Sequence, residues 1–90
     1  MDKKNTNITI LVIEDEIAIA EGLVDFLEFQ GYHVKHVADG LSGLTEGLSG
    51  KYGLILLDLM LPGMDGFPVC HKILEKDKDV PIIILSATNT

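Results

Sequence analysis

Three short, mostly apolar runs limit the fold of this 90-residue chain more than any other feature of its sequence. They are Ile8–Ile13, Leu54–Leu57 and Val80–Leu85, and the first and last are rich in β-branched residues. A strand that is apolar on both sides belongs in a sheet with both faces covered, which is typical of parallel α/β folds. We therefore expect these runs to be strands of one parallel sheet.

The segments between the runs have the character of helices and of one further strand. From Glu16 to Phe29 the apolar residues recur at helical spacing, and Gly31 suits the end of that helix. The other predicted elements are a strand over Tyr32–Val37, a weak helix that begins at Asp39 or Gly40 and ends near Leu48, and a helix over Phe67–Lys76. Strands that alternate with helices in this way predict a parallel sheet with right-handed crossovers.

The charge and composition exclude several classes of protein. The formal net charge is −7 and every basic residue is a lysine, so we expect this segment not to bind nucleic acid, which needs basic patches. No apolar run approaches the ~20 residues of a membrane span, and no signal-peptide segment follows the first lysines. The single Cys70 agrees with a reducing compartment. We expect a soluble, cytoplasmic protein with no membrane association.

Polar residues follow three of the predicted strands. Glu14 and Asp15 come directly after the first apolar run, Asp58 after the second and Ser86 after the third. The carboxyl ends of parallel strands meet at one edge of a sheet, where open α/β sheets place their ligands. Converging carboxylates repel one another and raise a pKa unless a cation lies between them. Mg²⁺ is the ion we expect, because it prefers oxygen ligands and keeps some of its waters.

Simpler roles stay open for individual residues. Asp58 also suits the start of a turn, since Pro62-Gly63 fits the centre of a type II turn. For Glu14, a favourable interaction with the dipole of the following helix is as good an interpretation as metal binding. Ser86 also suits a strand-end cap, and Asp65 suits the N-cap of the third helix better than catalysis. The three histidines, His33, His36 and His71, lack metal-ligand spacing, and we expect structural or surface roles for them.

Three segments of the chain resemble the receiver domain of two-component response regulators. They are VIEDE (Val12–Glu16), LILLDLMLPGMDG (Leu54–Gly66) and PIIILSA (Pro81–Ala87), and both their order and their spacing match the family. The resemblance covers nearly the whole chain. It implies a flavodoxin-like (CheY-like) doubly wound parallel sheet that lacks the last strand and helices of the family. The domain would span residues 8–90, after a polar extension over residues 1–7.

The resemblance also implies a role for each site residue. Asp58 is the expected phosphoacceptor, taking a phosphoryl group from a sensor histidine kinase. Asp15 and Asp58, with Glu14 acting through water, are the expected Mg²⁺-binding acids, and the backbone carbonyl of Met60 is a further expected ligand. Ser86 is the expected switch hydroxyl. Such a domain is a signalling switch, and we expect no enzyme with a diffusible product.

The first predicted helix carries the surface with which this family docks its kinase. The resemblance places Ile17, Ile19 and Gly22 there. We expect Ile17 to belong to the core, and Ile19 to be exposed and available to a partner.

Two departures from the family pattern affect these expectations. The acid pair is Glu-Asp where Asp-Asp is commoner, which changes the reach of the first acid. The family's fifth-strand lysine is not in this sequence, and we do not expect Lys72, Lys76 or Lys78 to reach the site, so phosphorylation of Asp58 should be slow or absent. Without a fifth strand, Val80–Leu85 becomes an apolar sheet edge, through which we expect a homodimer or a domain swap.

Two other functions remain open at this point. The first is a receiver-fold interaction or oligomerisation module that works without phosphorylation. The second is a flavodoxin-like ligand binder, which is disfavoured because no glycine-rich phosphate loop follows the first strand.

Overall fold

The structure is a computed structural model that describes residues 7–61 and 65–85. In chain order its elements are β1 (Thr9–Ile13), α1 (Ile17–Phe29), β2 (His33–Val37), α2 (Gly40–Gly47), β3 (Leu54–Leu57), α3 (Gly66–Lys76) and β4 (Ile82–Ile84). The predicted alternation of strands and helices is confirmed. The largest difference is in β4, which is shorter at both ends than the apolar run that predicted it.

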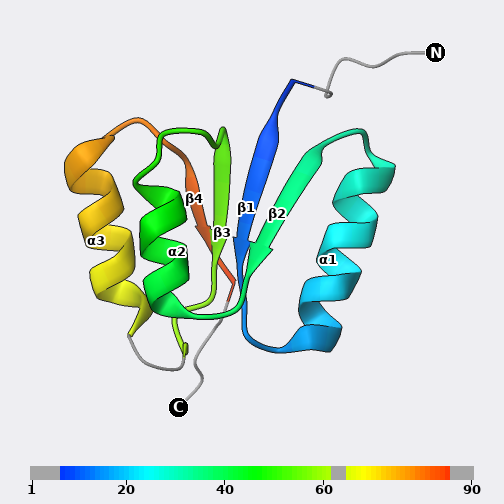
Figure 1. Ribbon diagram of the computed structural model, residues 1–90, viewed down its shortest axis with the longest axis horizontal. Helices are drawn as coiled ribbons and strands as arrows, with labels where there is room; N and C mark the ends of the chain where they lie inside the picture. Colours follow the sequence, from blue (N-terminus) through cyan, green and yellow to red (C-terminus); the bar gives the residue numbers. More distant parts are fainter. Residues whose placement is uncertain (1–6, 62–64, 86–90) are drawn as a thin grey trace.

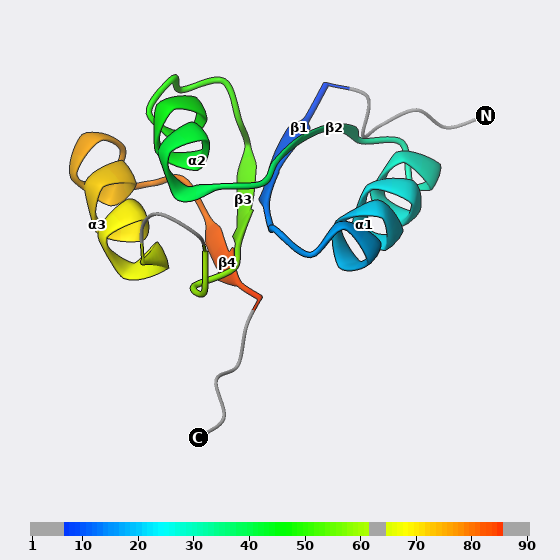
Figure 2. The same ribbon diagram turned by 60° about the horizontal axis from the view of Figure 1, so that its bottom comes forward.

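The four strands form one parallel sheet in the order β2-β1-β3-β4. Helix α1 covers one face, and α2 and α3 cover the other (Figure 1). Ile13, the last residue of β1, pairs with Val37 of β2 and with Leu57 of β3. Since these strands end at the same level, the residues that follow them lie along one edge of the sheet, which comes forward in Figure 2.

Both faces of the two central strands are buried. On the side of α2 and α3, the buried residues form one cluster: Leu11, Ile13, Ile55, Leu57, Val69 and Ile73. On the side of α1, Ile10, Val12 and Leu56 form a second cluster, against which Leu23 and Leu27 pack. The central strands are therefore apolar on both sides because helices cover both sides.

The start of α1 corrects one expectation. The side chain of Ile17 is 55% exposed, so the prediction that it belongs to the core is wrong. Ile17 is the first residue of α1, whose first turn projects past the carboxyl ends of the strands (Figure 1). Its apolar spacing matches the face of the helix that packs on the sheet, but in the described part of the chain no strand extends as far as this turn. Ile19 is exposed, as expected.

The ends of the helices follow the sequence signals. Gly31 has a φ of 101° and follows the C-cap residue of α1, as its position predicted. Asp39 caps α2, and its side chain accepts a hydrogen bond from the Ser42 N–H at 2.8 Å. Within the described residues, no helix is long and apolar enough to cross a bilayer.

Candidate metal centre

The structure brings together the three acids that the sequence places after β1 and β3. One carboxylate oxygen from each of Glu14, Asp15 and Asp58 lies within 4.8 Å of the other two. Glu14 and Asp58 are buried and Asp15 is half-buried. The predicted convergence of acids at one edge of the sheet is therefore present in the fold.

Backbone hydrogen bonds at the strand ends fix the positions of these acids. The Asp58 N–H donates to the Ile13 carbonyl at 2.9 Å, and the Glu14 N–H donates to the Val37 carbonyl at 3.1 Å. Each bond continues the sheet ladder by one residue beyond the last paired strand residues. Glu14 and Asp58 are thus held by the sheet itself, although their side chains belong to loops.

Glu14 lies both in the acid cluster and at the start of α1. Its side chain is 3% exposed, and its Oε2 accepts a hydrogen bond from the Glu16 N–H at 2.9 Å. Burial raises the pKa of Glu14 above its ordinary value, and the Asp58 carboxyl and the charge of Asp15 raise it further, against the opposing Glu16 N–H. Both interpretations of Glu14 are therefore compatible with its position. The pKa rise expected for crowded acids is also present, with burial as its main cause.

Asp58 is oriented by the residues that follow it. Its Oδ1 accepts a hydrogen bond from the Met60 N–H at 3.0 Å, which turns the chain away from the sheet. The Met60 side chain is 67% exposed. The role of the Met60 carbonyl stays a prediction. The Ser86 hydroxyl and the predicted turn at Pro62-Gly63 lie outside the described residues.

Gly66 allows α3 to begin directly against the strand end that carries Asp58. The Gly66 N–H donates to the Leu59 carbonyl at 2.9 Å. A Cβ at Gly66 would lie 2.5 Å from the Leu59 Cα and 2.8 Å from the Asp58 carbonyl oxygen, and such backbone atoms cannot rotate away. Asp65 caps the helix through the Phe67 N–H at 3.3 Å, as predicted. The close approach that requires glycine becomes visible only in the fold, although Gly66 is the last residue of the LILLDLMLPGMDG segment.

The donor set fits a hard divalent cation. It offers three carboxylates that converge from two strand ends, and oxygen atoms of this kind are the ligands that Mg²⁺ uses in proteins. Buried acids without a counter-charge are costly, so a cation between them removes much of that cost. Asp15, being half-buried, leaves the cluster open to solvent on one side. The residues present are therefore compatible with a bound Mg²⁺.

Comparisons of sequence place the chain among known regulators. It matches the family described as response regulator receiver domain over residues 10–90. It is 45% identical over 87 residues to the transcriptional regulatory protein ResD of Bacillus subtilis, covering 97% of this chain and 35% of that protein. It is 44% identical over 80 residues to the transcriptional regulatory protein CiaR of Streptococcus pneumoniae, covering 89% and 35%. The chain thus spans about a third of the length of these relatives.

Comparisons of structure give the same family. The response regulator TrrA of Thermotoga maritima, solved in complex with Mg²⁺ and BeF, has a TM-score of 0.85 at 38% identity, over 91% of this chain and 71% of that one. The receiver domain of the sensor histidine kinase PA1611 of Pseudomonas aeruginosa, solved with a magnesium ion in its active-site cleft, has a TM-score of 0.85 at 32% identity, over 91% and 69%. From its sequence match and its fold, this chain belongs to the response regulator receiver domain family.

Proposed function

We propose that this chain is a Mg²⁺-dependent receiver of two-component phosphorelay signalling, in which Asp58 accepts a phosphoryl group from a sensor histidine kinase. The observation that carries this proposal is the cluster that Asp58 forms with Glu14 and Asp15. The Mg²⁺-bound TrrA supports the choice of ion, and TrrA has also been solved in complex with the histidine kinase ThkA. The domain spans residues 8–90, with residues 1–7 as a polar extension.

Each residue of the site has a distinct role in this proposal. Asp15, Asp58 and the Met60 carbonyl bind Mg²⁺, and Glu14 does so through water. Bound Mg²⁺ supplies positive charge that offsets the acids and the oxygens of the incoming phosphoryl group. The Met60 N–H holds one Asp58 oxygen in place. Ser86 supplies the switch hydroxyl.

In the transfer itself, the Asp58 carboxylate is the nucleophile. An Asp58 oxygen forms a bond to phosphorus while the bond from phosphorus to the donor histidine nitrogen breaks, and the electron pair of that bond stays on the imidazole. The product is an aspartyl phosphate on the chain itself. The domain therefore acts as a switch and releases no product of its own. A cytoplasmic location belongs to this proposal and agrees with the unpaired thiol of Cys70.

Intact-mass measurement after incubation with Mg²⁺ and acetyl phosphate tests the proposal. We expect the wild-type chain to gain the mass of one phosphoryl group slowly, and Asp58→Asn to gain none. Asp65→Asn is the matched control, because it removes an acid of the same loop and asparagine still caps a helix. An adduct that persists in Asp58→Asn, or none on the wild type over long incubation, would contradict the proposal.

The edge strand β4 favours a second candidate function, that of an interaction module. Among the described residues β4 is an outer strand of the sheet, and Ile83 and Ile84 are 51% and 41% exposed. An apolar edge strand offers its free backbone groups to another chain. Sedimentation over a range of concentrations should show a dimer that Ile83→Lys weakens. A chain that stays monomeric throughout would rule this candidate out.

A further inference from the structure

The last two residues of β2 hold the backbone of Glu14 on both sides of its Cα. The Val37 carbonyl accepts the Glu14 N–H at 3.1 Å. The Nε2 of His36 lies 2.7 Å from the Glu14 carbonyl oxygen. Because a carbonyl oxygen can only accept, Nε2 carries the hydrogen and donates it. The end of β2, which lies beside the loop between β1 and α1 (Figure 1), thus fixes the first acid of the cluster.

The His36 ring provides a donor at the point where the sheet ladder ends. His36 pairs with Val12 in the register of β1 and β2, and Ile13 is the last residue of β1. The Glu14 carbonyl lies beyond the paired strand and belongs to a residue that is 3% exposed. A buried carbonyl without a partner is costly, and the ring of His36 removes that cost.

This bond has a consequence for Asp15 as well. The Glu14 carbonyl belongs to the peptide unit that joins Glu14 to Asp15, and a peptide unit is planar. A fixed carbonyl direction therefore fixes the plane of this peptide unit. It also fixes the position of the Asp15 Cα, which lies in the same plane. The hydrogen bond from His36 thus acts on the peptide that joins the two acids next to Asp58.

We propose that His36 is a positioning residue of the metal centre, which holds the Glu14–Asp15 peptide so that both carboxylates face Asp58. This inference rests on the proposed function, because it concerns the affinity of the same site for Mg²⁺. It assigns His36 no contact with the ion. What matters is the hydrogen that its ring donates.

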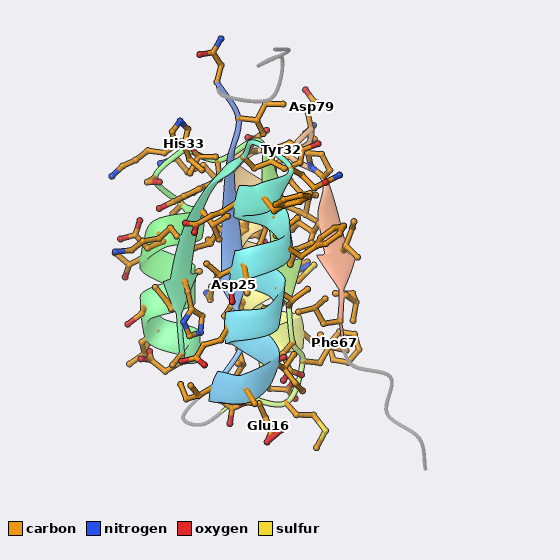
Figure 3. All side chains as sticks on the ribbon, turned by 90° about the vertical axis from the view of Figure 1, so that its right-hand side faces the viewer. Glu16, Asp25, Tyr32, His33, Phe67 and Asp79 are labelled. Atoms are coloured by element: carbon orange, nitrogen blue, oxygen red, sulfur yellow. The ribbon has the colours of Figure 1, made fainter. Side chains whose placement is uncertain are left out.

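The test is a titration of the full chain with MgCl₂, followed by the amide NMR signals of Asp15 and Asp58. His36→Phe keeps a ring and removes the donor, and we expect it to weaken Mg²⁺ binding about tenfold. His36→Gln keeps an N–H donor and should bind within about threefold of the wild type. His33→Phe is the matched control, since His33 is exposed, lies on the same strand and is at the far end from Glu16 (Figure 3). It should leave the affinity unchanged.

The outcomes separate this inference from the proposed function. A wild-type chain that does not bind Mg²⁺ at these residues overturns the function and the inference together. A wild type that binds, with His36→Phe binding equally well, overturns the inference alone. So does a His36→Gln variant as weak as His36→Phe, because the donor would then not be the cause. Thermal unfolding without Mg²⁺ checks the fold of each variant, and His36→Met replaces His36→Phe as the donor-free variant should the latter not fold.

Discussion

The polar side chains at the two ends of the sheet have different kinds of neighbour. At the carboxyl end, Glu14, Asp15 and Asp58 crowd together, and burial with the neighbouring acids raises the pKa of Glu14. At the amino end, polar groups meet suitable partners. The Tyr52 hydroxyl donates to Glu46 Oε1 at 2.6 Å, and the Lys76 ammonium donates to the Leu48 carbonyl at 2.9 Å.

The hydrogen-bonded polar groups at the amino end stabilise the fold, whereas the clustered acids at the carboxyl end form the candidate metal site. Matched donors and acceptors lower the free energy of the folded chain, whereas three acids without a counter-charge raise it. Lys76 is bonded to Leu48, which agrees with the expectation that it does not reach the acid cluster. The carboxyl end is thus the part of the sheet where a cation would stabilise the chain most.

The largest change in stability is expected on substitution of Gly66, at the carboxyl end of the sheet. In Gly66→Ala the new Cβ meets the backbone of Leu59 and Asp58, so the start of α3 must move away. We expect a loss of about 2 kcal/mol in the free energy of unfolding, measured with urea. Gly22→Ala is the control, because among the described residues outside its own helix backbone nothing lies within 4 Å of a Cβ added there, and alanine favours a helix. Equal stability of Gly66→Ala and wild type would show that the close approach is not required.

A smaller change in stability is expected on substitution of Glu14, and without Mg²⁺ it should be a gain. Its pKa in the folded chain lies above the ordinary 4.5, so the folded chain holds a proton that the unfolded chain has lost. Stability therefore falls as the pH rises from 4.5 through the raised pKa. Glu14→Gln has no such loss. Without Mg²⁺ it should melt at a higher temperature than the wild type at neutral pH, and at the same temperature in acid.

Added Mg²⁺ should reverse this order, because the wild type gains more stability from the ion than the variant does. Thermal unfolding across pH, with and without MgCl₂, measures both parts. A variant that is less stable than the wild type in the absence of the ion would refute the view that Glu14 costs stability.

The smallest effect is expected at the amino end. Burial, together with the hydrogen bond to Glu46, raises the pKa of Tyr52 to about 12, and the same bond lowers the pKa of Glu46. The stability from this pair is present above about pH 4.5 and below pH 10, and is lost in stronger acid or as the pH passes about 12. Tyr52→Phe should lower the free energy of unfolding only slightly at neutral pH, because the hydrogen bond lies partly in solvent.

Urea unfolding in a double-mutant cycle with Glu46→Gln measures this pair. If the effects of the two substitutions on the free energy of unfolding were additive, the hydroxyl and the carboxylate would not interact. This pair would then not stabilise the amino end of the sheet.

The sequence predicted the features that depend on periodicity and on strand ends. The apolar runs predicted the sheet, and the position of Asp58 directly after Leu54–Leu57 predicted its meeting with Glu14 and Asp15. A continuous apolar run indicates a strand that is buried on both faces, and parallel strands bring their carboxyl ends together. The sheet and the meeting of the acids therefore both follow from local patterns.

Other features have no local pattern to reveal them. The bond from His36 to Glu14 joins residues 22 positions apart, and no spacing rule connects a strand histidine with a loop carbonyl. Ile17 has the spacing of a core residue but lies beyond the strands, which only the position of α1 against the sheet determines. The need for glycine at Gly66 comes from backbone that is folded back on itself.

The most direct test of the central claim is to locate a divalent ion on the chain. Mn²⁺ takes the place of Mg²⁺ at oxygen sites and broadens the NMR signals of nearby amides. We predict that the amides of Glu14, Asp15 and Asp58 broaden first, and that excess Mg²⁺ restores them. Two acids at the amino end, Asp77 and Asp79, are exposed, and Asp79 lies at the far end from Glu16 (Figure 3). Broadening that begins there, or that spreads evenly over the chain, would contradict the account.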